Sequence, residues 1–479
     1  MALTILLPAL ACCAVLALGS ARKALLNVYL PVVLLLPQYY VLRIQHLPPL
    51  SFADAAVIPL ALVLLAAEMP SWRWSWMDLW VILLAASSGL SEGLSTELAN
   101  GDWIRLFSAT SAASPRLGVN IANGGLTFVN SLLTFVLPYM IGKILLEQRD
   151  SDGAPMSRKA VRRMVSLLAA VAVIGVYDFA KGVSLWQKAF RFLLPYRSEI
   201  WEPQVRWGFG RVAGPFGQAI LAGLIFLVGL IYCLWLRRVD RGWGTRRIFA
   251  ALPLTARGLI LAALAGGLLM TQSRGPWIGL ALALVFVLFT RMFSAPKAVL
   301  AFAFFLGVFA PASYLLGKQY TQASLRSAAT EAQRNAVYRR ELLTNYLPVV
   351  AERPTFGWGA TSYPIVDGQR SIDNEYLLLA VTQGLFGLAL FALVVAGTGA
   401  RLLQLMSQSH LPEERQLAIA HLSVLIGVAV TITTVYLGEQ VTVIFFLFIG
   451  WVQGMRPESV AAGAWQSLGS VPRFRRVLA

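Results

Sequence analysis

The chain has 479 residues, of which 57% are hydrophobic and only 13% are charged. A soluble domain carries about 25% charged residues, so this composition excludes an ordinary soluble protein. The net charge of +17 would suit nucleic-acid binding, but cytoplasmic loops of membrane proteins are also rich in Lys and Arg. We therefore expect no nucleic-acid partner. The cysteines lie in apolar segments and the histidines are scattered, so we expect no disulfide framework, no metal and no cofactor.

Apolar segments recur along the whole chain, and many reach the roughly 17–25 residues that cross a bilayer. In chain order they are 2–19, 25–42, 52–68, 78–95, 121–146, 162–181, 216–236, 256–271, 275–290, 297–316, 374–397, 416–436 and 439–454. The sequence therefore predicts an all-α, polytopic membrane protein with about 11–13 transmembrane helices. The first segment lacks a basic start and an evident cleavage site, so we interpret it as a retained helix.

The segments divide the chain into three parts. We expect N-terminal transmembrane helices over 1–120, a transmembrane core over 121–454 with outer loops at 182–215 and 317–373, and a flexible cytoplasmic tail over 455–479. Within the second outer loop, apolar and aromatic residues of Thr330–Val350 recur at helical spacing. This periodicity predicts an amphipathic helix that lies on the membrane surface.

The distribution of basic residues predicts the orientation. When the loops are assigned alternately to the two sides, one side holds far more Lys and Arg in its short connections, and the positive-inside rule makes it cytoplasmic. The two outer loops then face the opposite side, although they too are basic. Orientation does not explain that excess, and an anionic ligand does, because Arg presents donors that suit phosphate. The outer basic residues are Lys181, Lys188, Arg191, Arg197, Arg206, Arg211, Lys318, Arg326, Arg334, Arg339, Arg340, Arg353 and Arg370.

Two short motifs place arginines beside turns. Arg206 and Arg211 flank a glycine-rich stretch that ends in Gly214-Pro-Phe-Gly217, where the backbone can approach a ligand closely. Arg274 follows Thr271-Gln-Ser in a very short turn between two apolar segments. Both motifs suit an anion site. For the first motif the alternative is a re-entry loop that meets lipid headgroups. For the second, the alternatives are an arginine that extends to the interface and a helix cap by Ser273.

A third motif closes the second outer loop. It comprises Pro354-Thr-Phe-Gly-Trp-Gly359 and then Asp373-Asn374-Glu375-Tyr376 at the start of an apolar segment. Two carboxylates beside an amide and a phenol could supply a base that takes a proton from a sugar hydroxyl. Asp373 is equally well suited to cap the helix that follows, and the two interpretations are compatible.

Together these motifs resemble the O-antigen ligase and polymerase family of bacterial envelope proteins. The resemblance rests on Arg206 to Gly217, on Thr271-Gln-Ser-Arg-Gly275, and on the run from Arg339 through Asp373-Asn-Glu-Tyr-Leu377 to Gly384-Leu-Phe-Gly387. It implies a helical, metal-independent glycosyltransferase of the GT-C type. Ligases of the family carry a histidine before the Asn of the last motif, where this chain has Asp373, which favours a polymerase of O-antigen or exopolysaccharide.

The resemblance also implies the roles of individual residues. Asp373, with Glu375 second, would be the base, while Arg206, Arg211, Arg274 and either Arg334 or Arg339 would bind the pyrophosphate of the donor. Asn374 and Tyr376 are further candidate substrate-binding residues. The alternatives are a ligase and, from another class, a transporter or flippase of lipid-linked saccharide, although no internal symmetry supports the latter.

The resemblance further implies the partners and the location. The expected donor is an undecaprenyl-pyrophosphate-linked glycan, the acceptor is a glycan or lipid A-core, and membrane lipids surround the protein. A chain-length regulator protein is a candidate partner. The expected location is the bacterial inner (plasma) membrane, with the active face in the periplasm.

Overall fold

The computed structural model describes residues 2–44, 46–68, 72–94, 115–147, 155–191, 204–247, 255–321, 330–366, 369, 371–409 and 411–456. These residues form an all-α fold, as predicted, and the protein is a polytopic membrane protein. Seven of the described helices are long and apolar enough to cross a membrane, and four more are apolar but shorter. Residues 457–479 of the predicted tail, and 95–114, 192–203 and 322–329 of the predicted loops, lie outside the described residues.

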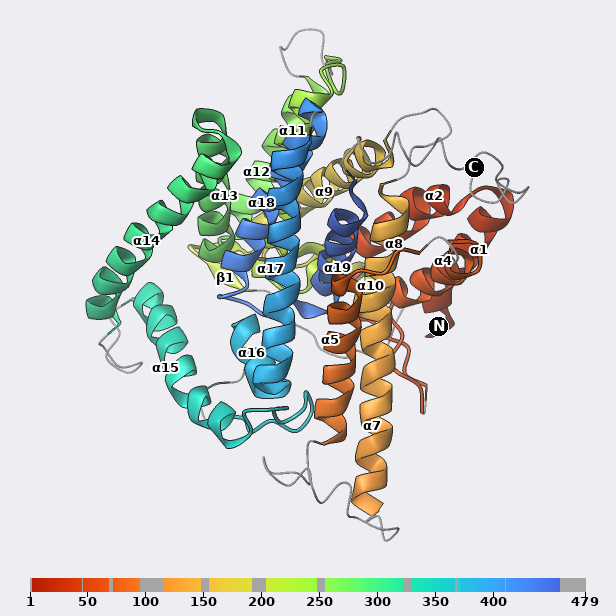
Figure 1. Ribbon diagram of the computed structural model, residues 1–479, viewed down its shortest axis with the longest axis vertical. Helices are drawn as coiled ribbons and strands as arrows, with labels where there is room; N and C mark the ends of the chain where they lie inside the picture. The colour runs from red at the N-terminus through yellow and green to blue at the C-terminus, as the bar shows by residue number, and fades with distance from the viewer. Residues whose placement is uncertain are drawn as a thin grey trace.

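The N-terminal part of the chain begins with short helical pieces and continues with longer helices (Figure 1). In chain order these are η1 (Ala2–Leu6), α1 (Leu7–Leu18), α2 (Ala21–Ala24), η2 (Leu25–Tyr29), α3 (Leu30–Leu35), α4 (Phe52–Glu68), α5 (Trp76–Gly93), α7 (Pro115–Ser131), η4 (Leu132–Val136), α8 (Leu137–Leu145) and α9 (Met156–Lys181). The segments η2 and η4 are π-helical, and each precedes a helix with proline in its first turn. Proline lacks the N–H that would continue a regular ladder, and a widened turn accommodates this loss.

The chain from residue 185 onward holds most of the elements that surround the site, which also includes the end of α9. They are α10 (Leu185–Arg191), β1 (Val205–Arg206), β2 (Phe209–Gly210), η5 (Gly214–Phe216), α11 (Ala219–Val239), α12 (Ala256–Met270), α13 (Arg274–Met292), α14 (Ala295–Tyr320), α15 (Glu331–Glu352), α16 (Glu375–Thr382), α17 (Gly384–Gln408), α18 (Pro412–Thr431) and α19 (Gly438–Gly454). Strands β1 and β2 pair antiparallel as a small hairpin.

Glycine lets several helices approach one another closely. A Cβ atom on Gly450 of α19 would lie 1.9 Å from the carbonyl oxygen of Tyr139 in α8, and one on Gly279 of α13 would lie 2.6 Å from that of Gly427 in α18. Small residues at such crossings are typical of helix packing in lipid, where backbone proximity maximises van der Waals contact.

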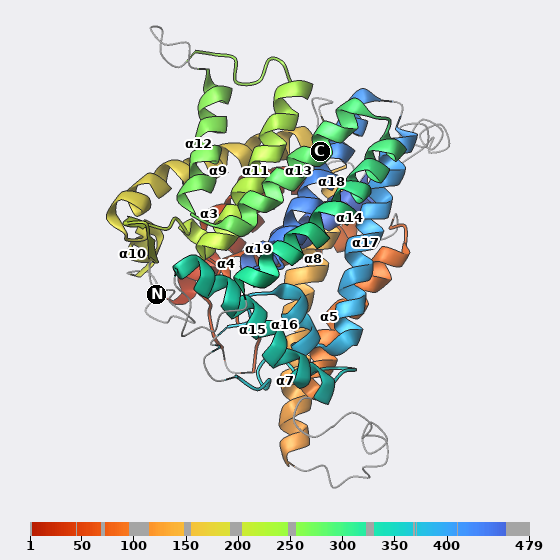
Figure 2. The same ribbon diagram turned by 90° about the vertical axis from the view of Figure 1, so that its left-hand side faces the viewer.

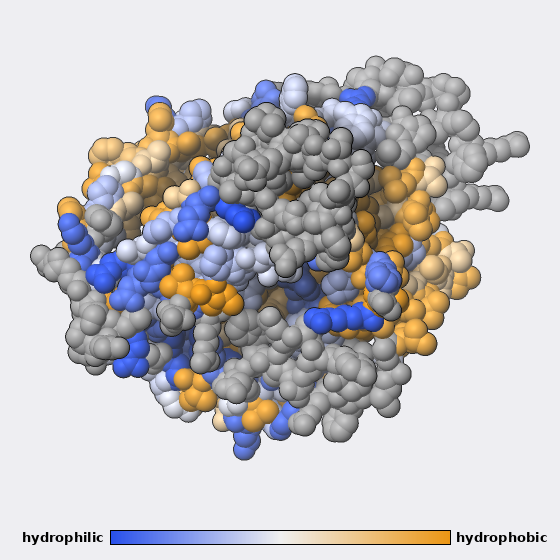
Figure 3. Space-filling model, turned by 90° about the horizontal axis from the view of Figure 1, so that it is seen from below, coloured by the Kyte–Doolittle hydropathy of each residue, from blue (hydrophilic) through white to orange (hydrophobic). Residues whose placement is uncertain are grey.

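The arrangement separates two ends of the bundle. The connections α11–α12, α13–α14 and α17–α18 lie at one end, whereas α15 and α16 lie toward the other (Figures 1 and 2). Viewed from this second end, hydrophilic residues gather between apolar flanks (Figure 3). The site described below belongs to this end.

The predicted amphipathic helix is present as α15. Thr330 caps it by accepting a hydrogen bond from the Gln333 N–H at 3.1 Å. Its buried residues Leu342 and Tyr346 pack in a small apolar cluster with Leu377 and Val381 of α16. The helix is therefore attached to the bundle through α16.

One predicted helix, 374–397, is divided in two. The break lies at Gln383 and Gly384, where Gly384 has φ +67°, a left-handed conformation that ends a helix. The motif 354–359 fills the break: the Trp358 and Gly359 N–H groups donate to the carbonyls of Val381 and Thr382, both at 2.9 Å. These bonds satisfy the carbonyls that the end of α16 leaves without helical partners.

Candidate functional site

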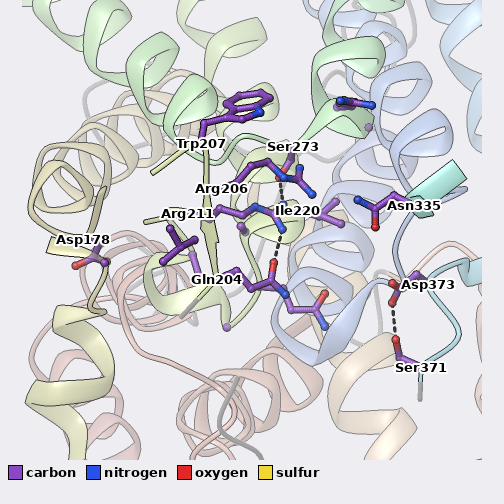
Figure 4. A pocket seen from close by; sticks show the side chains of 18 of the residues that line it. Asp178, Gln204, Arg206, Trp207, Arg211, Ile220, Ser273, Asn335, Ser371 and Asp373 are labelled. Atoms are coloured by element: carbon purple, nitrogen blue, oxygen red, sulfur yellow. Dashed lines mark hydrogen bonds between the residues drawn. The ribbon is translucent and has the colours of Figure 1, made fainter. Parts of the chain in front are cut away.

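A polar cavity of about 780 Å³ lies beside the hairpin, and six parts of the chain line it. They are the end of α9 with the turn into α10, the hairpin β1–β2, the start of α11, the start of α13, α15, and the segment before α16. Its volume is within the range of small-ligand sites, roughly 300–1,000 Å³. Figure 4 shows Asp178 at one side of the cavity and Asp373 at the other, with the hairpin arginines between them.

The hairpin directs two arginines toward the end of α12. The Nη1 group of Arg206 donates to the Gln272 carbonyl at 2.8 Å, and Nε of Arg211 donates to the Thr271 carbonyl at 3.0 Å. Arg211 also donates from Nη2 to Ser273 Oγ at 2.8 Å and from Nη1 to Gln204 Oε1. Both side chains therefore line the cavity while they bind the turn that leads into α13.

Arg274 and Arg339 face the same cavity from two other elements. Neither guanidinium has a hydrogen-bond or ion-pair partner among the described residues. Arg274 is exposed and begins α13, although a cation is disfavoured at the positive end of a helix. Burial lowers the pKa of Arg339; the carboxylate of Asp373 opposes this effect, and the charges of Arg206 and Arg274 add to it.

Asp373 is the acidic group on the α15 side of the cavity. Its Oδ1 accepts a hydrogen bond from the Ser371 hydroxyl at 2.9 Å (Figure 4). Burial raises the pKa of Asp373, whereas the Ser371 bond and the nearby Arg339 charge lower it, and burial is the largest cause. On α15, the hydroxyl of Tyr338 donates to the Ser371 carbonyl at 2.8 Å, which ties this segment to the helix that carries Arg339.

Four of the predicted site residues do not line the cavity. Glu375 accepts a hydrogen bond from the Leu437 N–H at 2.8 Å, and the Tyr376 hydroxyl donates to the Ala429 carbonyl at 3.1 Å. Asn374, rather than Asp373, caps α16 by accepting from the Leu377 N–H at 3.0 Å. The prediction that Asp373 caps this helix was therefore wrong. Arg334 is exposed on α15, one turn before Arg339.

The opposite wall of the cavity was not predicted from the sequence. There Asp178 is only 3% exposed, and its Oδ1 accepts from the Leu185 N–H at 2.9 Å. Ser184, Gln187 and Gln204 extend this wall. An acidic residue at a helix end was the only sequence signal. Within the described part of the chain, no three His, Cys, Asp or Glu side chains lie close enough together to hold a metal.

The fold and the cavity define a class: a multi-pass helical membrane protein with a basic, carboxylate-bearing cavity toward one end. Residues 259–392 match the family model described as O-antigen ligase. This match confirms the resemblance seen in the motifs of the chain. The matched stretch contains Arg274, Arg339 and Asp373, whereas Arg206 and Arg211 precede it. No curated protein matches the chain.

Proposed function

We propose that this protein is a membrane glycosyltransferase that polymerises undecaprenyl-pyrophosphate-linked oligosaccharide repeat units of an O-antigen or exopolysaccharide. The reaction takes place on the outer face of the bacterial inner membrane, with the cavity open to the periplasm. The family match supports a function of the O-antigen ligase and polymerase type. The donor, the polymerase activity, the metal-independent GT-C chemistry and the location are our proposal.

The observation that carries the proposal is the charge of the cavity. Four arginines, from the hairpin, from the start of α13 and from α15, line one cavity together with two carboxylates, Asp373 near Arg339 and Asp178 on the opposite wall. Like charges repel in a site of low dielectric, so a bound anion would stabilise this excess of arginines. A pyrophosphate supplies that charge, and guanidinium groups match its oxygens.

The geometry supports a single displacement step. The Asp373 carboxylate takes the proton of an acceptor sugar hydroxyl, and the hydroxyl oxygen forms a bond to the anomeric carbon of the donor. The bond from that carbon to the pyrophosphate oxygen breaks, and its electron pair leaves with the undecaprenyl pyrophosphate. Arg274 and Arg339, which have no hydrogen-bond or ion-pair partner among the described residues, stabilise the departing charge. Attack opposite the leaving group inverts the anomeric centre.

The presence of Asp373 where family ligases carry a histidine favours polymerisation over ligation. The two activities differ in what a deletion strain accumulates. We expect loss of this protein to leave single repeat units on the lipid carrier or acceptor. Long chains stranded on the carrier would instead identify a ligase that uses lipid A-core or another acceptor.

A purified system tests the chemistry directly. The full-length protein in detergent, given a lipid-pyrophosphate repeat unit extracted from the deletion strain, should lengthen it in the presence of EDTA. Movement of the lipid-linked saccharide across vesicles without lengthening would identify a transporter instead. A requirement for a divalent cation would contradict the proposed chemistry.

A further inference from the structure

The turn between α12 and α13 is buried and conformationally unusual. Thr271, Gln272 and Ser273 are each no more than 3% exposed, and Gln272 has φ +51°. A residue other than glycine seldom adopts this left-handed conformation, which persists only where the surroundings enforce it. The turn ends directly at Arg274, so its conformation sets where Arg274 enters the cavity.

The hairpin arginines bind the carbonyls of this turn. The last carbonyls of a helix lack helical partners and carry the negative end of its dipole, so cationic donors are favourable there. The carbonyls of Thr271 and Gln272, directly after α12, accept bonds from Arg211 and Arg206 at 3.0 and 2.8 Å. A backbone bond adds to this contact, because the Val212 N–H donates to the Met270 carbonyl at 3.1 Å.

Arg211 uses every nitrogen of its guanidinium group within the protein. Nε and Nη2 bind the turn at Thr271 and Ser273, and Nη1 binds Gln204. The Gln204 carbonyl in turn accepts from the Arg211 N–H at 2.8 Å. Arg274, only one residue beyond Ser273, has no such partner among the described residues. The two arginines therefore differ in role although both line the cavity.

We propose that Arg211 is a positioning residue, which holds the left-handed turn at Gln272 so that Arg274 enters the cavity and binds the anion. This revises the sequence-based role of Arg211 as a direct pyrophosphate ligand. The inference rests on the proposed function for the identity of the anion. The positioning role itself requires two things: the anion binds Arg274, and Arg211 acts through the turn.

Removal of the conformational strain provides the test. Arg211→Lys keeps the charge but loses the fork that binds the turn. Gln272→Gly lets the turn adopt its conformation without enforcement. The effect of Arg211→Lys should therefore be large in the native background and small when residue 272 is glycine. The measurement is the thermal stabilisation of the full-length protein in detergent as inorganic pyrophosphate is titrated.

The expected result is that Arg211→Lys weakens pyrophosphate binding about tenfold in the native background, which corresponds to release of a strained left-handed residue. In the Gln272→Gly background, Arg211→Lys should weaken pyrophosphate binding by less than about threefold. Arg274→Ala, the matched control, should weaken binding equally in both backgrounds. Should Arg211→Lys fail to yield folded protein, Ser273→Ala, which removes only the Nη2 contact, takes its place.

The outcomes separate this inference from the proposed function. Equal weakening by Arg211→Lys in both backgrounds, or no weakening in either, overturns the positioning role and leaves the anion site intact. A native protein that pyrophosphate does not stabilise at all overturns the anion site, and the proposed function with it.

Discussion

The N–H of Gly359 donates to the carbonyl of Thr382 at 2.9 Å, which joins the segment after α15 to the end of α16. The start of α16 is also held, because the Glu375 N–H donates to the Ile432 carbonyl at 2.9 Å. The helix is thus fixed at both ends, and Asp373 lies two residues before its first residue. The fixed helix positions the candidate base.

The glycine at the break after α16 should not tolerate replacement by a residue with a side chain. Gly384 has φ +67°, and a Cβ atom there would lie 2.3 Å from the Thr355 carbonyl oxygen. We expect Gly384→Ala to destabilise the fold by at least the roughly 1–3 kcal/mol of a strained left-handed residue. Thermal unfolding in detergent measures this change. Gly266→Ala is the control, since a Cβ on Gly266 meets nothing within 4 Å; equal melting temperatures for the two variants would contradict the prediction.

Arg339 and Arg334 lie on the same helix but should differ in importance. Arg339 lines the cavity, whereas Arg334 is exposed and does not. Arg339→Ala should reduce chain extension about 10²–10³-fold, which is typical for loss of a donor that stabilises developing charge. Arg334→Ala should leave chain length and yield close to those of the native protein. The comparison is made by gel analysis of polysaccharide from complemented deletion cells, and a larger loss for Arg334→Ala would reverse the assignment.

The two carboxylates of the motif Asp373-Asn374-Glu375-Tyr376 should also differ in their importance for activity. Asp373 faces the cavity, whereas the Glu375 carboxylate accepts from the Leu437 N–H. Asp373→Asn should lower the extension rate about 10²–10⁴-fold through loss of a general base. Glu375→Gln keeps an oxygen acceptor for Leu437 and should retain most of the activity. Rates with the purified protein test both, and full activity of Asp373→Asn would remove this residue from the chemistry.

The raised pKa of Asp373 predicts the pH dependence of the rate. The base acts only when ionised, and burial raises its pKa above the ordinary value of 3.8. The rate should therefore fall at acidic pH, with an apparent pKa above that value, as the folded protein takes up the proton. The residual rate of Asp373→Asn should lack this acidic limb. A pH–rate profile from which the native limb is absent, or in which Asp373→Asn retains it, would contradict the assignment.

The raised pKa of Asp373 also means that its ionised form destabilises the folded protein. Since its pKa is higher in the folded than in the unfolded state, the folded protein holds the proton more tightly, and stability falls as pH rises from 3.8 through the raised value. Near neutral pH, Asp373→Asn should therefore melt no lower than the native protein. A lower melting temperature would indicate that the carboxylate has a structural role instead.

The sequence was sufficient for the architecture because lipid restricts the choices. Apolar segments of a certain length must be helical where no water can bind the backbone. The segment 52–68, for example, is α4, and Thr330–Val350 differs from α15 by at most two residues. The break at Gly384 escaped prediction because it depends on a distant segment, 354–359, which supplies hydrogen bonds that no local pattern encodes.

For the site, residue type alone indicates which side chains can bind an anion or accept a proton. Which of these side chains face one cavity depends on the folded arrangement of the helices. It brings Arg274, Arg339 and Asp373 together, and it turns Glu375 and Tyr376 toward backbone partners on other segments. The reason is physical: residue type sets charge and hydrogen-bonding capacity, whereas the direction of a side chain at a helix end depends on packing between segments far apart in the chain.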